Sequence, residues 1–66
     1  MASEISEMMI ELAKYHMALR GWKQRNLAQE MRVDETELSA LLNRKRPWSL
    51  KTIEAFKHAT GIVVEI

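Results

Sequence analysis

Apolar residues recur at steps of three and four along the first third of the chain, as one buried face of a helix requires. They are Ile5, Met8, Met9, Leu12, Tyr15 and Leu19. Ser3 precedes this run as a capping residue, and Gly21 follows it as a residue that readily takes the left-handed conformation at a helix end. The pattern therefore predicts a helix over Glu4–Arg20 that buries this face.

A second, shorter helix is predicted over Gln24–Met31, with Leu27, Ala28 and Met31 facing inward. Its capping position falls on Lys23, whose side chain is a poor cap. We therefore expect this helix to depend on packing by Trp22, the residue just outside it.

The third helix has a stronger start signal. Asp34 followed by Glu37 is an analogue of the capping box, and Val33 with Leu38 can form a hydrophobic staple across it. This helix is predicted over residues 35–43. Its expected buried stripe consists of Leu38, Leu41 and Leu42.

The basic run that ends in Pro47 breaks the third helix, and a similar start signal follows at once. Trp48 lies outside, Ser49 is the cap, and a fourth helix is predicted over Leu50–Thr60 with Gly61 at its end. The residues that we expect it to bury are Ile53 and Phe56, with Ala59 or Leu50.

The tail, residues 62–66, is rich in β-branched residues and reads as a short strand. The chain offers no second strand, so we expect the tail to pair with the same strand of a twofold mate. The predicted homodimer interface consists of Ile62, Val63, Val64 and Ile66. The alternative is a tail folded back on the first helix, with dimerisation through the fourth helix or none. The expected fold is a single domain over residues 1–66, mainly α, with four helices and a short C-terminal β-strand.

Composition excludes several classes of protein. The 66 residues include no cysteine, and His, Asp and Glu show no metal-like spacing, so we expect no metal site and no cofactor. No nucleophile pairs with a base and no phosphate loop is present, which argues against an enzyme. Apolar runs are too short for a membrane span and the start has no leader pattern, so a soluble cytoplasmic protein is expected.

The net charge is only +1, but the charges are clustered. Two basic groups flank one acidic stretch around the start of the third helix. The first basic group is Lys14, Arg20, Lys23, Arg25 and Arg32, and the second is Arg44, Lys45, Arg46 and Lys51. A charge run is commonly just a solvated face, so its meaning depends on where the fold puts it.

The second and third helices are separated by only residues 32–34, and Ala28 is small enough to let them approach closely. A turn this short forces a steep crossing, which is the helix-turn-helix arrangement. Residues 21–39 read GWKQRNLAQEMRVDETELS, with a Gln opening one helix and a β-branched Val33 before the next. This order resembles the Cro/repressor (XRE-type, lambda-repressor-like) family, and the resemblance extends to Gly61. Glycine is common in that family before Val33 and after Asn43, where Arg32 and Arg44 stand here.

The resemblance implies a sequence-specific regulator of transcription, a repressor of the Cro type, that binds double-stranded DNA as a homodimer. In that family the third helix is the recognition helix, which enters the major groove. The residues implied to read bases are Glu35, Thr36, Ser39 and Ala40. Those implied to contact phosphates or flanking bases are Gln24, Arg25, Asn43, Arg44, Lys45 and Arg46.

Several of these residues also have a structural explanation. Asp34 and Glu37 suit a helix start because acids there satisfy free amides and the helix dipole, and Glu35 is divided between that role and base reading. The tryptophans are expected as core or staple residues, and the histidines as surface or satisfied core residues, not ligands. The methionines are core filler, with Met8 and Met9 able to form a soft interface. A second function on the same fold also stays open: an antitoxin or adaptor whose partner is a toxin or another protein.

Overall fold

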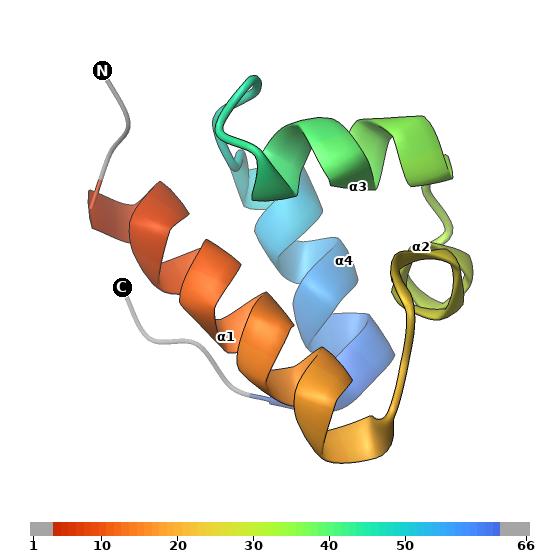
Figure 1. Cartoon of the computed structure of the whole chain (residues 1–66). Helices are drawn as coiled ribbons and strands as arrows, with labels where there is room; N and C mark the ends of the chain where they lie inside the picture. The colour runs from red at the N-terminus through yellow and green to blue at the C-terminus, as the bar shows by residue number, and fades with distance from the viewer. Residues whose placement is uncertain (1–3, 63–66) are drawn as a thin grey trace.

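Four helices make up most of residues 4–62, the part of the chain that the computed structural model describes (Figure 1). They are α1 (Glu4–Arg20), α2 (Gln24–Met31), α3 (Glu35–Leu42) and α4 (Leu50–Thr60). The prediction of a mainly α chain with four helices is confirmed. The only boundary that differs is the end of α3, which stops one residue early: the Asn43 backbone amide still bonds to the Ser39 carbonyl at 3.0 Å, but Asn43 is the C-cap, and the left-handed Arg44 after it turns the chain out of the helix.

Residues 4–62 contain no strand. Ile62 belongs to no regular element and packs against the core of its own chain. Val63, Val64 and Ile66, the rest of the predicted dimer strand, lie outside the described residues, as does the proposed cap Ser3. Within the described part, no helix combines the length and the apolar character that crossing a membrane requires.

The core lies between all four helices. Its largest fully buried side chains are Met9, Ile10, Leu27, Leu38, Leu41 and Phe56. The ring of Trp48, itself buried, meets Phe56 edge-on at a centroid distance of 6.1 Å. The backbone amide of Trp48 also donates to the buried Ser6 hydroxyl at 3.1 Å, which ties the loop before α4 to α1.

The crossing of α2 and α3 follows from the short turn between them. In Figure 1, α2 is seen end-on while α3 runs across the view, so the two helices cross steeply. Arg32 ends α2 in the left-handed conformation at φ 59°, and the amide of Val33 then bonds to the Ala28 carbonyl at 3.0 Å. Arg44 after α3 has φ 62°. Both arginines therefore hold the conformation that glycine takes most easily, at the two positions where the resembled family commonly has glycine.

The predicted buried face of α1 is only partly right: Met9 is buried, and Ile5 and Leu12 pack against the core at its edge. Tyr15 and Leu19 are 65% and 67% exposed, and Met8 is 38% exposed. The buried residues of α1 are instead Ser6, Met9, Ile10, Ala13 and His16. This face is turned by one residue from the predicted one, roughly 100° around the helix. The apolar arc of α1 is wider than the area that α3 and α4 cover, so the sequence pattern alone does not select the buried part.

On α4 the buried positions are Thr52, Ile53, Phe56 and Thr60. Ala59 is half-buried, whereas Leu50 is 71% exposed, so the alternative that Leu50 belongs to the core is wrong. Thr60 is accommodated because its hydroxyl donates to the Phe56 carbonyl at 2.8 Å. Gly61 ends the helix with φ 74°, as predicted.

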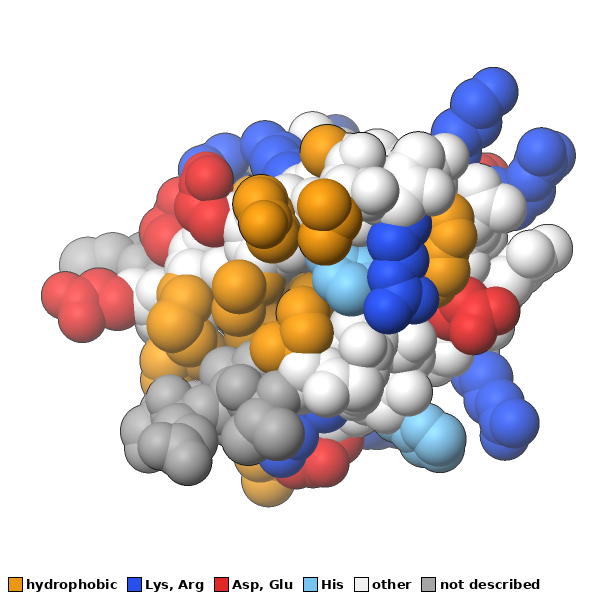
Figure 2. All heavy atoms as spheres, turned by 90° about the horizontal axis from the view of Figure 1, so that it is seen from below, with side chains coloured by type: hydrophobic (Ala, Val, Ile, Leu, Met, Phe, Trp, Pro, Cys, Tyr) orange, Lys and Arg blue, Asp and Glu red, His pale blue; other side chains and the backbone are white. Residues whose placement is uncertain are grey.

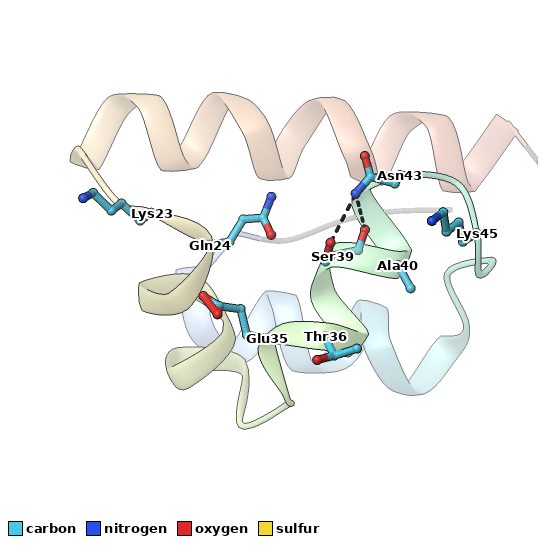
Figure 3. Close-up of a pocket in the computed structure, with 8 residues that line it drawn as sticks. All are labelled: Lys23, Gln24, Glu35, Thr36, Ser39, Ala40, Asn43 and Lys45. Atoms are coloured by element: carbon cyan, nitrogen blue, oxygen red, sulfur yellow. Dashed lines mark hydrogen bonds between the residues drawn. The ribbon is translucent and has the colours of Figure 1, made fainter.

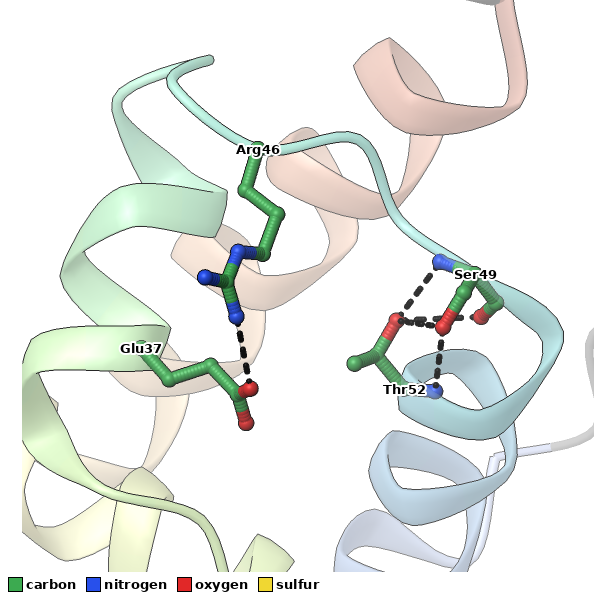
Figure 4. Close-up of polar contacts among 4 residues, drawn as sticks. All are labelled: Glu37, Arg46, Ser49 and Thr52. Atoms are coloured by element: carbon green, nitrogen blue, oxygen red, sulfur yellow. Dashed lines mark hydrogen bonds and ion pairs between the residues drawn. The ribbon is translucent and has the colours of Figure 1, made fainter.

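The two predicted caps behave differently. The Ser49 hydroxyl accepts from the Thr52 amide at 3.3 Å, and the Thr52 hydroxyl accepts from the Ser49 amide at 2.8 Å, which is a reciprocal capping box (Figure 4). Asp34 occupies the cap of α3 with extended backbone, but its side chain makes no capping hydrogen bond. The predicted capping box at Asp34 is therefore wrong, because Glu37 turns instead to Arg46, with 3.0 Å between the carboxylate and the guanidinium.

This difference sets an expected order of stability effects. Ser49→Ala removes a formed cap and should cost about 1 kcal/mol of unfolding free energy. Asp34→Ala keeps the helix start and removes only an acid near the dipole, so it should cost about 0.3 to 0.5 kcal/mol. Urea unfolding of both variants measures the two losses. An equal or larger loss for Asp34→Ala would contradict the assignment of the caps.

His16 is a buried ionisable group on α1. Its ring packs edge-on against Trp22 at 5.8 Å and Phe56 at 6.3 Å, and Nε2 has no hydrogen-bond partner among the described residues. Burial lowers the pKa of His16, and the positive charge of Arg20 lowers it further. The folded state therefore holds His16 neutral at a pH where the unfolded chain already takes up a proton.

The unfolding free energy should consequently fall as the pH drops below about 6.5, the ordinary pKa of histidine. One such group contributes a slope of at most about 1.4 kcal/mol per pH unit. Thermal melts between pH 7 and pH 5 measure the decrease, which His16→Phe should remove and His58→Gln, at an exposed position, should leave. An undiminished pH dependence in His16→Phe would contradict this account.

Candidate nucleic-acid interface

An open hollow of about 640 Å³ lies where the start of α2, the polar side of α3 and the loop after α3 meet (Figure 3). Figure 3 looks into it, with α3 across the middle and α1 along one edge. Its lining residues are Lys23, Gln24, Glu35, Thr36, Ser39, Ala40, Asn43 and Lys45. It thus brings together side chains from three separate stretches of the chain.

The floor of the hollow is one face of α3. Glu35, Thr36, Ser39 and Ala40 are spaced by one, three and one residues, so they share the side of the helix away from its buried leucines. Glu35 and Thr36 are exposed, while Ser39 and Ala40 are half-buried. This face therefore presents two hydroxyls, one carboxylate and two methyl groups to a ligand that enters the hollow.

The side of the hollow formed by α2 is fixed by the start of that helix. Lys23 is extended, with φ −92° and ψ 169°, and its backbone amide donates to the Asn26 side-chain oxygen at 2.9 Å. This bond provides the cap that the Lys23 side chain itself does not. Gln24 follows in the first helical turn, and both side chains reach the hollow (Figure 3).

The opposite side is formed by the loop after α3. The Asn43 side-chain amide donates to the Ser39 carbonyl at 2.8 Å and to the Ser39 hydroxyl at 3.2 Å. The left-handed Arg44 then reverses the chain, so that the amides of Lys45 and Arg46 both reach the Ala40 carbonyl, at 2.9 and 3.3 Å. This reversal brings Lys45 back to the rim of the hollow.

Arg44, one of the predicted phosphate contacts, is engaged elsewhere. Its Nε and Nη2 donate to the two carboxylate oxygens of Glu7 on α1, each at 2.6 Å. The hydrogen bonds from Arg44 lower the pKa of Glu7, against the opposing effect of desolvation, and the charge of Lys14 lowers it a little more. The same pairing raises the pKa of Arg44.

Arg46 is likewise paired, with Glu37 (Figure 4), and is not among the residues that line the hollow. Arg25 does not line the hollow either, although it is exposed on α2. The hollow therefore gathers the predicted residues except the three arginines. Lys23 was predicted as a poor cap and as a member of the first basic group but not as a site residue, yet it lines the hollow, and its position directly before Gln24 was the available signal.

The charges of the hollow are two lysines, from opposite sides, against the single carboxylate of Glu35. The two lysines at the rim can pair with an anionic backbone. The short polar side chains on the exposed face of α3 can form hydrogen bonds with polar groups of the same ligand. Among residues 4–62, no three His, Asp or Glu side chains gather in a way that could hold a metal ion.

Comparisons of the chain with protein-family models, curated proteins and solved structures find no match. The function proposed below is therefore inferred from the sequence and the structure of the chain alone.

Proposed function

We propose that this chain is a sequence-specific double-stranded DNA-binding protein of the lambda-repressor-like helix-turn-helix type, acting as a dimeric regulator of transcription in the cytoplasm. The observation that carries the proposal is the hollow itself. The start of α2, the exposed polar face of α3 and Lys45 converge on one side of the molecule, where a major groove would be read. Support also comes from the steep crossing of α2 and α3 and from the left-handed Arg32 in the turn.

In this proposal α3 is the recognition helix. Thr36 and Ser39 offer hydroxyls for base edges, and the Thr36 and Ala40 methyl groups suit a thymine methyl. The Glu35 carboxylate accepts a hydrogen bond from the exocyclic amine of cytosine. Although Glu35 is acidic and lies near phosphates, it thereby contributes selectivity for cytosine. These side chains carry the choice of sequence.

Affinity comes from the rims. Lys23 and Lys45 contact phosphates on either side of the groove, while Gln24 donates amide hydrogen bonds. Arg44 and Arg46 are held by Glu7 and Glu37 in the free protein. The Arg46–Glu37 pair is joined by a single hydrogen bond and is weak, so a phosphate can compete for Arg46 as DNA approaches, whereas the bidentate Arg44–Glu7 pair is harder to displace.

The second candidate is an antitoxin or adaptor that binds a protein through the same face. The observation that favours it is the neutralisation of Arg44 and Arg46 by carboxylates, which leaves Glu35 with only two lysines around it. A protein partner with basic side chains would fit Glu35 as well as a cytosine does.

A salt titration of binding to a random-sequence duplex separates the two functions. DNA binding predicts an association constant that falls steeply with salt, with a logarithmic slope of about −0.9 per phosphate contact. A mobility shift from about 50 to 200 mM salt measures the slope. No shifted band at low salt would overturn the DNA-binding proposal and favour the protein-binding alternative.

A further inference from the structure

A stripe of apolar side chains on α1 is left outside the core. Its members follow one another at steps of three, four, three and four residues, which is the spacing of a coiled-coil seam. They are Ile5, Met8, Leu12, Tyr15 and Leu19, called the α1 stripe below. Tyr15 and Leu19 are about two-thirds exposed, while Ile5 and Leu12 are half-buried.

The α1 stripe is the main apolar surface of the described chain. Of the four large hydrophobic side chains that are exposed among residues 4–62, three belong to it, and the fourth, Leu50, stands alone at the start of α4. Figure 2, seen from below Figure 1, shows hydrophobic side chains grouped on one side of the molecule. A contiguous apolar surface of this kind marks an interaction site, whereas a single exposed leucine needs no explanation.

The charges of α1 indicate what covers the stripe. Glu7 is paired with Arg44, so the first half of the helix contributes the acids Glu4 and Glu11, while the second half, with Lys23 just after it, carries only bases: Lys14, Arg20 and Lys23. A second copy of α1 laid antiparallel brings each acidic half beside a basic half. A parallel copy would set acids against acids, which is unfavourable. The helix is therefore complementary to itself in one orientation.

We infer that α1 is the dimer interface, and that two copies of this chain pack their α1 stripes antiparallel about a twofold axis. The register follows from the stripe: Met8 lies against the partner's Leu19, and Leu12 against the partner's Tyr15. Every contact then occurs twice, as a closed twofold interface requires.

The α1 interface itself does not depend on the proposed function. Only its consequence for DNA binding, described next, rests on that function. In Figure 3, α1 runs along one edge of the view into the hollow. A twofold axis at that edge, along the line of sight, places the second hollow on the same side of the dimer. Both recognition helices then face one DNA duplex.

Substitution of the stripe tests the interface, and Leu50 supplies a control of matched chemistry and exposure. Tyr15→Glu and Leu19→Glu should each raise the dimer dissociation constant on the order of 100-fold, because each places two carboxylates in an apolar seam. Leu50→Glu, at 71% exposure on α4, should leave it unchanged. Sedimentation equilibrium without DNA measures all three, with helical content by circular dichroism as the check of folding.

Cysteine cross-linking tests the orientation, since the chain has no cysteine of its own. A mixture of Met8→Cys and Leu19→Cys chains should form a mixed disulfide dimer on mild oxidation. Leu19→Cys alone should not, because an antiparallel register separates the two copies of residue 19 by roughly 16 Å along the helix. Efficient cross-linking of Leu19→Cys alone would overturn the antiparallel arrangement.

The remaining outcomes are equally decisive. A chain without residues 63–66 that stays dimeric supports the α1 interface against the predicted strand pairing. Three results would each overturn the α1 interface. They are a monomeric wild-type protein, loss of the dimer only when residues 63–66 are removed, and dimers of Tyr15→Glu and Leu19→Glu that are as tight as the wild-type dimer. Because these measurements contain no DNA, a protein that dimerises through α1 but fails to bind duplex refutes the proposed function and leaves the interface standing.

Discussion

A chain carrying both Lys23→Ala and Lys45→Ala is expected to bind random duplex DNA on the order of 100-fold more weakly than wild type at about 0.1 M salt. The two lysines face the hollow from opposite sides. Each is expected to neutralise one phosphate, so the logarithmic salt slope should also fall by about 2 per protomer. Fluorescence anisotropy over a range of salt concentrations measures both quantities.

The matched control replaces two lysines outside the hollow. Lys51→Ala with Lys57→Ala removes the same charge from α4, away from the hollow's lining residues. This control should change affinity by less than about threefold, since it alters only the long-range field, which salt screens. Equal losses in the two double variants would show that net charge, and not the hollow, determines binding.

The second large effect concerns the core. Phe56→Ala should leave the chain largely unfolded at 25 °C, because removing a fully buried phenylalanine costs about 3 to 5 kcal/mol. A single core in a chain of this size supplies only a similar amount. The lost ring also removes the edge contacts to His16 and Trp48. Far-ultraviolet circular dichroism measures the loss of helix.

Leu50→Ala is the control for this substitution, because Leu50 lies on the same helix but is exposed. It should change the unfolding free energy by no more than about 0.5 kcal/mol. A Phe56→Ala variant that melts cooperatively near the wild-type temperature would mean that the core is not organised around this ring.

The helix limits were predictable because they depend on local signals. Gly21 and Gly61 take the left-handed conformation that ends a helix, and Ser49 forms the cap expected of it. The end of α3 was misplaced by one residue because Asn43 is its C-cap, with its backbone amide and its side chain both bonded to the Ser39 carbonyl, and the chain turns at the left-handed Arg44. A left-handed arginine leaves no periodic trace in the sequence.

The partners of side chains were not predictable. Arg44 pairs with Glu7, which is 37 residues away along the chain, and Arg46 pairs with Glu37. In the sequence, a basic run after a helix has the same appearance whether its side chains are free or paired with carboxylates from elsewhere in the chain. The buried face of α1 was predicted only in part for a related reason, since Ser6 and His16 are polar residues and yet are buried.

Selection of bound duplexes from a random-sequence pool is the direct test of sequence-specific DNA binding through α3. The account predicts enrichment of a site with two symmetry-related halves, whose centres lie about 34 Å, one helical turn, apart. Thr36→Ala, selected in parallel, should lose preference at a position in each half by about 1 to 3 kcal/mol. A pool in which no sequence is enriched, or an enriched site that Thr36→Ala leaves unchanged, would contradict it.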